Sequence, residues 1–368
     1  MSEKPPYIPG VLLAEGFYRD EVQPVLNAQF PGIKYSAALI GSGSEVLGFD
    51  TEMSTDHHWG PRVMMFLEPD DYEKECDNIL EVLSQKLPTT YRGYSTNFSE
   101  PDPDDKGTQT LQPVASNPVN HRVEIYTIAG FFTDYMNINI QDRVEPIDWL
   151  TIPQQKLRSI TSGKVFYDDL GLKDVIKRFS WYPHEVWLYL LAATWTRIGQ
   201  EEHLMGRAGD IGDEIGSSII ASRLVRDIMR LAYFMEKDYP PYAKWFGTAF
   251  LRLNSAAALE PAIYGILKAG SREEREGYFC SAGTTLLKMH NSLEITAPVL
   301  TEASPFWSQP FMVIQGEKIA AVIIDTITDP QIKPLTRPSL IGSIDIFSDN
   351  TDLLTDASFR NIIRKLYE

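Results

Sequence analysis

The sequence predicts an α+β protein in which a small N-terminal mixed sheet precedes a bundle of helices. Two short apolar runs near the N-terminus, 37–40 and 63–67, have the composition of buried strands. Three later stretches place apolar side chains at helical spacing, over residues 183–202, 213–237 and 273–293. Together these patterns favour a sheet-containing N-terminal part and a helical C-terminal part.

The chain length and charge set the first limits on organisation and partners. With 368 residues, the chain has room for two domains with their own cores. We expect residues 1–160 to form the sheet-containing domain and residues 161–368 the mainly helical domain, with a less regular tail. The formal net charge of −16 repels phosphate backbones, so a long nucleic acid is not an expected partner. An acidic surface favours a cationic or neutral small molecule, although it also serves solubility alone.

Cysteine use and hydropathy indicate a cytoplasmic protein. The N-terminus has no apolar targeting segment and no stretch reaches the length of a membrane span, so we expect no membrane partner. Cys76 and Cys280 are too far apart in the sequence to indicate a disulfide framework or a thiolate metal site. The oligomeric state is left open by these features.

The N-terminal elements are predicted from local periodicity. Residues 10–29 have helical spacing, which Pro24 is expected to interrupt or kink. A second helix is expected over 70–87, with an acidic first turn. Residues 88–120 lack periodicity and are predicted to form a surface loop, with a lid over a site as the alternative. Residues 121–128 alternate between apolar and polar side chains, as in a strand.

The C-terminal elements are mostly helical. A helix is expected from about 153 to 162, and an extended piece from 163 to 169. Another helix is expected after Pro240-Pro241, and Asp213 or Ser217 is expected to cap the helix that precedes it. The sequence leaves the secondary structure of residues 318–328 in the tail open, because this β-branched run suits a helix or a strand.

A glycine-serine turn and a cluster of polar residues lie between the two apolar runs near the N-terminus. Gly41-Ser42-Gly43-Ser44 follows the first run, and such a turn lets backbone N–H groups approach a phosphate. Asp56 and His58 precede the second run. If both lie in a strand, they point to the same face and hold one ion. The alternatives are an ordinary turn and a histidine of the core or surface.

These residues resemble the nucleotidyltransferases of the polymerase-β-like superfamily. The segment GSGSEVLGFDTEMSTDHHWGPR (41–62) is similar in particular to the proteins grouped under the domain of unknown function 4037. Further matching pieces are DWL (148–150), GKVFYDDLG (163–171), YPHEVWLYLLAATWTRIGQEE (182–202), GDEIGS (212–217), YPPYAKWFGTAF (239–250) and HN (290–291). The resemblance therefore spans nearly the whole chain.

The resemblance implies a metal-dependent site. In the superfamily, carboxylates hold Mg²⁺ (or Mn²⁺), and a neighbouring strand supplies a third carboxylate. By this resemblance Asp56, His58 and Glu124 become the catalytic and metal-binding residues, with Glu124 as a ligand or general base. The alternative for Glu124 is an exposed glutamate of a strand. His58 occupies the place of an acid, and imidazole suits Zn²⁺ or Mn²⁺ better than Mg²⁺. Asp50 and Glu52 are the alternative source of a carboxylate.

The same resemblance implies contacts with a nucleotide, which we expect from six residues: Gly43, Ser44, Arg62, Arg207, Lys244 and Tyr242. Arg62 is expected to hold a phosphate, with a strand-edge charge as the alternative. Lys244 is framed by aromatic residues, of which Tyr242 suits stacking on a base or acceptor ring. Arg207 and Asp213 lie in the stretch 206–218. Arg207 is expected to contact a phosphate and Asp213 an amine or hydroxyl group of the acceptor, with helix capping alone as the alternative.

The expected function is the transfer of a nucleoside monophosphate from an NTP, ATP by default, to a hydroxyl group of a small cationic or neutral acceptor. One alternative is a protein that binds a nucleotide or metabolite without turnover, because His58 replaces a metal carboxylate. A second alternative is an enzyme of the same fold with a softer metal and a different reaction.

Overall fold

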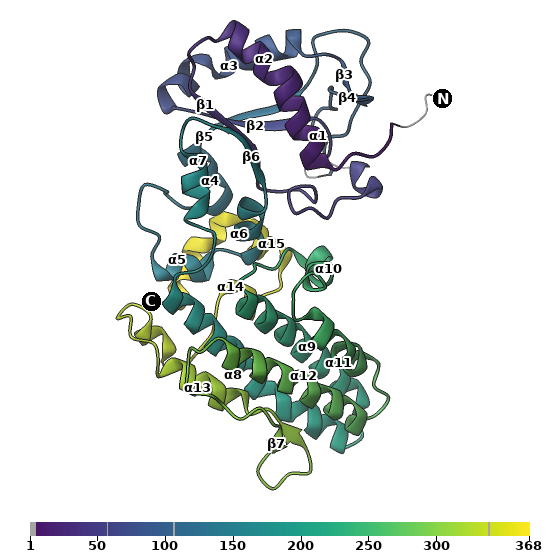
Figure 1. The fold of residues 1–368 in the computed structure, drawn as a ribbon, viewed down its shortest axis with the longest axis vertical. Helices are drawn as coiled ribbons and strands as arrows, with labels where there is room; N and C mark the ends of the chain where they lie inside the picture. The colour runs from purple at the N-terminus through teal and green to yellow at the C-terminus, as the bar shows by residue number, and fades with distance from the viewer. Residues whose placement is uncertain (1–4, 57, 106, 338) are drawn as a thin grey trace. The chain divides into compact units, whose positions relative to one another are not determined.

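The protein is described by a computed structural model, shown in Figure 1, which covers residues 5–56, 58–105, 107–337 and 339–368. The chain divides into two compact units: Met1–Arg143 with Lys156–Ser180 (unit 1), and Val144–Gln155 with Trp181–Glu368 (unit 2). The boundary expected at residue 160 falls in the second segment of unit 1. A mixed sheet in unit 1 and a helical unit 2 confirm the predicted α+β class.

A four-stranded mixed sheet in the order β5-β2-β1-β6 organises unit 1. The strands are β1 (Tyr35–Leu39), β2 (Arg62–Leu67), β5 (Arg122–Thr127) and β6 (Lys164–Asp168). β1 is antiparallel to β2 and β6, whereas β2 and β5 are parallel, with Met64 opposite Glu124. All residues of β1 and β2 are buried, which confirms the two apolar runs as interior strands.

Helices cover one face of this sheet (Figure 1). They are α1 (Gly10–Phe17), the π-helical turn Tyr18–Val22, α2 (Gln23–Gln29) and α3 (Pro69–Lys86). Pro24 lies in the first turn of α2, where its missing N–H group is tolerated, and the π-helical turn directly precedes that helix. The helical stretch therefore continues through Pro24, and its irregularity lies in the preceding turn rather than at the proline.

The other parts of unit 1 complete the sheet and its loops. α4 (Ile128–Met136) places Phe131 against Phe66 and Tyr126 of the sheet, with ring centroids 5.7 Å apart in both pairs. The region 88–120 is mostly loop, as predicted, with short strands β3 (Thr90–Tyr91) and β4 (Tyr94–Ser95). It does not lie wholly on the surface, because Phe98 is buried. α7 spans Leu172–Lys177.

Unit 2 is a bundle of amphipathic helices (Figure 1). The longer helices are α8 (His184–Asp210), α9 (Glu214–Glu236), α11 (Ala256–Lys268), α12 (Arg272–Ser292) and α13 (Gly316–Ile324). The shorter elements are α5 (Pro146–Thr151), α6 (Gln154–Thr161, shared with unit 1), α10 (Phe246–Phe250), β7 (Ser304–Pro305), β8 (Met312–Val313), α14 (Ile344–Phe347), α15 (Thr351–Thr355) and α16 (Arg360–Ile363).

The structure settles and extends several expectations for unit 2. The run 318–328 is helical for most of its length, within α13. α8 continues two turns beyond the expected end at residue 202, and α11 was not predicted. None of the helices within the described ranges is both long and apolar enough to cross a membrane.

A buried carboxylate joins α8 to the start of α13. Glu202 is 3% exposed, and its two oxygens accept hydrogen bonds from the backbone N–H groups of Ile314 (2.6 Å) and Gly316 (3.0 Å). Burial raises the pKa of Glu202 to about 7, against an ordinary value of 4.5. The folded protein therefore retains a proton that the unfolded chain releases between these values.

This raised pKa predicts a pH-dependent stability. A raised folded-state pKa adds stability below the unfolded value and loses it as the pH rises through the folded value. We expect the free energy of unfolding to fall by about 2–3 kcal/mol between about pH 5 and about pH 8 from Glu202 alone. Urea unfolding at both pH values tests this, with Glu202→Gln expected to flatten the dependence. Glu302→Gln, which removes an exposed carboxyl group, serves as the control, and an equal slope in both variants would contradict the assignment.

Candidate functional site

The glycine-serine turn leaves β1 in a conformation that requires glycine. Gly41 has φ 80° and Gly43 has φ 143°, both in the region that side chains rarely adopt. A Cβ atom on Gly43 would lie 2.6 Å from nitrogen Nη2 of Arg62 and 2.6 Å from an oxygen of Glu45. The turn therefore packs its backbone directly against these two charged groups.

A buried ion pair fixes the turn to β2. Both Arg62 and Glu45 are buried, and Glu45 Oε1 accepts hydrogen bonds from Nε (2.9 Å) and Nη2 (2.5 Å) of Arg62. Nη2 also donates to the carbonyl oxygen of Ser42 (2.8 Å). Burial alone would lower the pKa of Arg62, but Glu45 outweighs this effect and raises that pKa. Arg62 thus positions the turn, and its contact with a phosphate stays a prediction.

The strand expected at Asp56 and His58 is wrong. Residues Glu52–Asp56 form a 3₁₀ helix, His58 has φ 50°, and β2 begins only at Arg62. Gly60-Pro61 precedes β2, and a proline restricts the residue before it and removes a backbone donor. The argument that alternate residues of a strand share a face therefore does not apply. The side chain of Asp56, and all of His57, lie outside the described part of the structure, so the role of Asp56 stays a prediction.

The alternative carboxylates near the turn differ in their surroundings. Asp50 Oδ2 accepts hydrogen bonds from the backbone N–H of Gly10 (2.7 Å) and from Nε1 of Trp59 (3.1 Å). It therefore joins the start of α1 to the segment before β2. Glu52 lies on the exposed first turn of the 3₁₀ helix.

His58 and Glu124 converge on the guanidinium group of Arg122. Nη1 of Arg122 lies 2.8 Å from Nδ1 of His58, and Nη2 donates to Oε1 of Glu124 at 3.0 Å. Because arginine only donates, Nδ1 of His58 accepts this hydrogen bond and carries no proton. The structure thus brings together two of the predicted ligands. Sequence reasoning missed Arg122, although the alternation of β5 places it on the same face as Glu124.

The donor set decides how a metal ion would fit here. Among the described residues, no group of three or more His, Cys, Asp or Glu side chains is arranged around a metal position. One imidazole nitrogen and one carboxylate oxygen nevertheless face a single cation, Arg122. Such a mixed pair suits Mn²⁺ or Zn²⁺, but a divalent ion would have to displace the guanidinium group. The Mg²⁺ or Mn²⁺ requirement stays a prediction.

The nucleotide-binding residues predicted in unit 2 fall in two places. Arg207 is exposed on α8, with its guanidinium carbon 6.0 Å from the centre of the Phe306 ring. Lys244 follows α9, and its ammonium group lies 4.9 Å from the centre of the Trp245 ring. Tyr242 accepts a hydrogen bond from Nε1 of Trp245 (2.8 Å) and lines a cavity of about 390 Å³. The structure therefore places Tyr242 at a cavity, but Arg207 packs elsewhere in unit 2.

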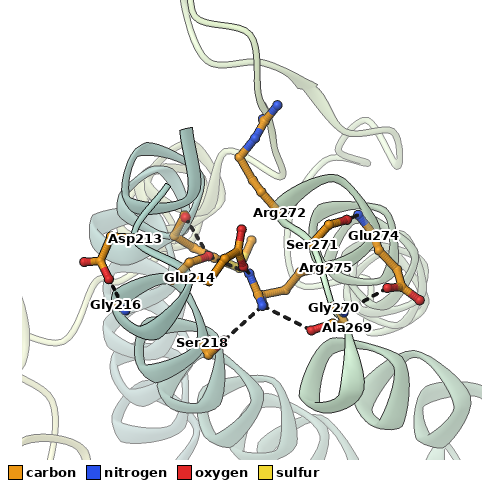
Figure 2. Close-up of polar contacts among 12 residues, drawn as sticks. Asp213, Glu214, Gly216, Ser218, Ala269, Gly270, Ser271, Arg272, Glu274 and Arg275 are labelled. Carbon is orange, nitrogen blue, oxygen red and sulfur yellow. Dashed lines mark hydrogen bonds and ion pairs between the residues drawn. The ribbon is translucent and has the colours of Figure 1, made fainter. Parts of the chain in front are cut away.

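The stretch around Asp213 is explained by helix packing. Asp213 caps α9 by accepting a hydrogen bond from Gly216 N (2.8 Å), as the sequence predicted. Figure 2 shows Arg275 of α12 reaching toward this helix start, where it pairs with Glu214 (2.9 Å). Arg275 also donates to Ser217 Oγ at 2.8 Å. Sequence reasoning missed Arg275, because nothing local marks a charged residue as buried.

Part of this chain matches the model of a known protein family. Residues 149–246 match the model of the family described as Domain of unknown function (DUF4037). This segment includes the Asp213 stretch and excludes the glycine-serine turn. The search of curated proteins found no match.

One solved structure aligns with much of the chain. It is a nucleotidyltransferase-like protein from Exiguobacterium sibiricum 255-15, with 12% identity, covering 76% of this chain and 74% of that chain at a TM-score of 0.28. Similarity at this level supports no conclusion about activity. The family model that matches residues 149–246, DUF4037, is the same family that the sequence motifs resemble.

Proposed function

We propose that the protein transfers a nucleoside monophosphate from an NTP, ATP by default, to a hydroxyl group of a small cationic or neutral acceptor. The observation that carries this proposal is the glycine-serine turn after β1, which Arg62 and Glu45 hold in a conformation that requires glycine. A turn held this way has its backbone N–H groups arranged before a ligand arrives. An uncharged or cationic acceptor agrees with the formal net charge of −16, because an acidic surface attracts cations and repels anions.

The residues of unit 1 have separate roles in the proposed reaction. The backbone of Gly43 and Ser44 binds the phosphates, and Arg122 stabilises negative charge beside them. Glu124 orients or deprotonates the acceptor hydroxyl group. When bound with Asp56, His58 and Glu124, a divalent ion such as Mg²⁺ or Mn²⁺ supplies charge neutralisation. The contacts predicted for Arg207, Lys244 and Tyr242 of unit 2 stay predictions.

A second candidate function is nucleotide binding without turnover. The pairing of Arg122 with His58 and Glu124 favours it, because a guanidinium group already provides the positive charge between these side chains. In this case the phosphates bind through the turn and Arg122, and a metal ion is not required.

Pyrophosphate release separates the two candidates. Purified protein is incubated with labelled NTPs and a panel of amino-sugar acceptors, with Mg²⁺, Mn²⁺ or a chelator. For transfer we expect metal-dependent release of pyrophosphate, lowered about a hundredfold or more by Asp56→Asn. Asp134→Asn removes an exposed carboxylate of α4 and should leave the rate unchanged.

The second candidate gives a different result in the same samples. It predicts NTP binding that persists in chelator without pyrophosphate release and is lost in Arg122→Gln. Absence of NTP binding under all of these conditions would contradict both functions.

A further inference from the structure

Two cavities in unit 2 share a wall of positively charged side chains. One has a volume of about 390 Å³ and the other about 270 Å³. Arg226, Arg230 and Asp349 line both of them. Tyr242 and Phe246 add aromatic surface to the larger cavity. The two volumes therefore combine a charged wall with an apolar one.

The charged wall is built mainly by one face of α9. Arg223, Arg226 and Arg230 are spaced three and four residues apart, so they lie along the same side of the helix. Arg197 of α8 joins them in the smaller cavity. Four guanidinium groups around one cavity repel one another, and burial of Arg230, which is 5% exposed, adds a desolvation cost. A cluster of arginines in a chain of net charge −16 therefore suits an anionic ligand.

Two carboxylates of the chain, Asp227 and Glu201, pair with arginines of this cluster, and Asp227 also lines the smaller cavity. Asp227 is 1% exposed and pairs with Nε of Arg197 (2.8 Å) and Nη1 of Arg230 (3.5 Å). Glu201 pairs with Arg223 and lies 3.8 Å from Arg197. These contacts pair three of the four guanidinium groups with a carboxylate, and the fourth, that of Arg226, has only Asp349 as its ion-pair partner among these carboxylates.

Two further carboxylates face the cavities, and both are weak partners. Asp349 pairs with Nη1 of Arg226 at 2.9 Å, but its side chain is 75% exposed, and exposed pairs add little stability. Asp345 directs both oxygens to the backbone N–H of Gln154 (3.2 and 3.1 Å), and burial raises its pKa to about 6. Burial and the neighbouring Arg226 lower the pKa of Arg230 to about 10, whereas Asp227 and Asp345 act in the opposite direction.

We propose that these cavities bind the phosphate monoester of a small metabolite. The phosphate group displaces the exposed carboxylate of Asp349 from Arg226 and sits against Arg226 and Arg230, which present the fork geometry that suits phosphate oxygens. The organic part lies against Tyr242 and Phe246. A volume near 390 Å³ is at the low end for small-molecule sites, which suits a monoester. This site lies wholly within unit 2, and it does not depend on nucleotidyl transfer.

The proposal predicts opposite effects on ligand affinity for substitutions at Asp349 and Arg226. If its carboxylate competes with the phosphate, Asp349→Asn tightens binding, by about threefold to tenfold. Arg226→Gln removes a phosphate donor and weakens binding by about tenfold or more. Asp349 is exposed and Arg226 is partly exposed, so both variants should fold, which their thermal unfolding curves verify. Arg19→Gln removes an exposed arginine of unit 1 and should leave binding unchanged.

Calorimetric titration of the full chain at constant ionic strength provides the measurement. The ligands are inorganic phosphate, a hexose monophosphate and a nucleoside monophosphate, each up to about 10 mM, where even a millimolar site is filled. We expect at least one ester to bind more tightly than inorganic phosphate. Three results would overturn the proposal: no binding of any ligand, no preference for an ester, or equal weakening by Asp349→Asn and Arg226→Gln.

Discussion

Arg62→Met is expected to lower the free energy of unfolding of unit 1 by about 3–5 kcal/mol, because it leaves a buried carboxylate without its cation. Glu45 is 4% exposed and receives two hydrogen bonds from Arg62, so water cannot take over the lost partner. The carbonyl oxygen of Ser42 loses its donor in the same variant. The turn should then lose its fixed conformation, and NTP binding should fall with stability. Urea unfolding followed by circular dichroism, together with NTP titration, measures both effects.

Two companion variants show whether the ion pair is responsible. Arg19→Met removes an exposed arginine that pairs with Glu15, and should change stability by less than about 0.5 kcal/mol. The double variant Glu45→Leu, Arg62→Met should recover part of the loss, because the uncompensated charge is gone. If Arg62→Met unfolds at the same urea concentration as Arg19→Met, the ion pair does not hold the turn.

The sheet of unit 1 could be predicted because its signals are local. The apolar runs at 37–40 and 63–67, and the alternation at 121–128, depend only on neighbouring residues, and all three correspond to strands. The pairing of Glu45 with Arg62 joins residues 17 positions apart and leaves no periodic trace. A charged residue in a sequence usually indicates surface, so burial of such a pair is visible only in three dimensions.

The candidate site was predicted less well, for identifiable reasons. The sequence argument predicts a strand at Asp56 and His58, although Gly60-Pro61 marks a break before β2. Arg122 lies on the same strand face as Glu124, but a lone arginine beside a glutamate ordinarily indicates an exposed pair. The chain passes between the units at residues 143–144, 155–156 and 180–181. The assignment of residues 144–155 to unit 2 depends on contacts between distant residues, such as that of Gln154 N with Asp345, 191 positions away, which a local sequence pattern does not reveal.

Another buried arginine, Arg275, contacts three helix ends of unit 2. Arg275 is 2% exposed and lies in the first turn of α12. Its guanidinium group pairs with Glu214 in the first turn of α9 and donates to Ser218 Oγ at 2.9 Å (Figure 2). It also donates to the carbonyl oxygen of Ala269 at 3.2 Å, where α11 ends and a positive charge complements the helix dipole. The GDEIGS segment is thus constrained by packing as well as by capping.

Removing this arginine should destabilise unit 2 strongly. Arg275→Met strips Glu214, Ser217 and Ser218 of one donor group, and we expect a loss of about 2–3 kcal/mol in the free energy of unfolding, because Ser217 is buried whereas Glu214 is 43% exposed. Arg275→Lys should lose less, since an ammonium group keeps the charge but cannot span the forked contacts. Urea unfolding monitored by the fluorescence of Trp187 and Trp195, both buried in α8, reports on this unit.

Lys288→Met provides the matched control, because Lys288 is exposed on the same helix and its loss should cost less than about 0.5 kcal/mol. The expected order of stability is therefore Lys288→Met, Arg275→Lys and Arg275→Met, from most to least stable. An Arg275→Lys variant as unstable as Arg275→Met would mean that the forked geometry, rather than the charge, carries the effect. Equal stability of Arg275→Met and Lys288→Met would show that the three helix ends are held by apolar packing alone.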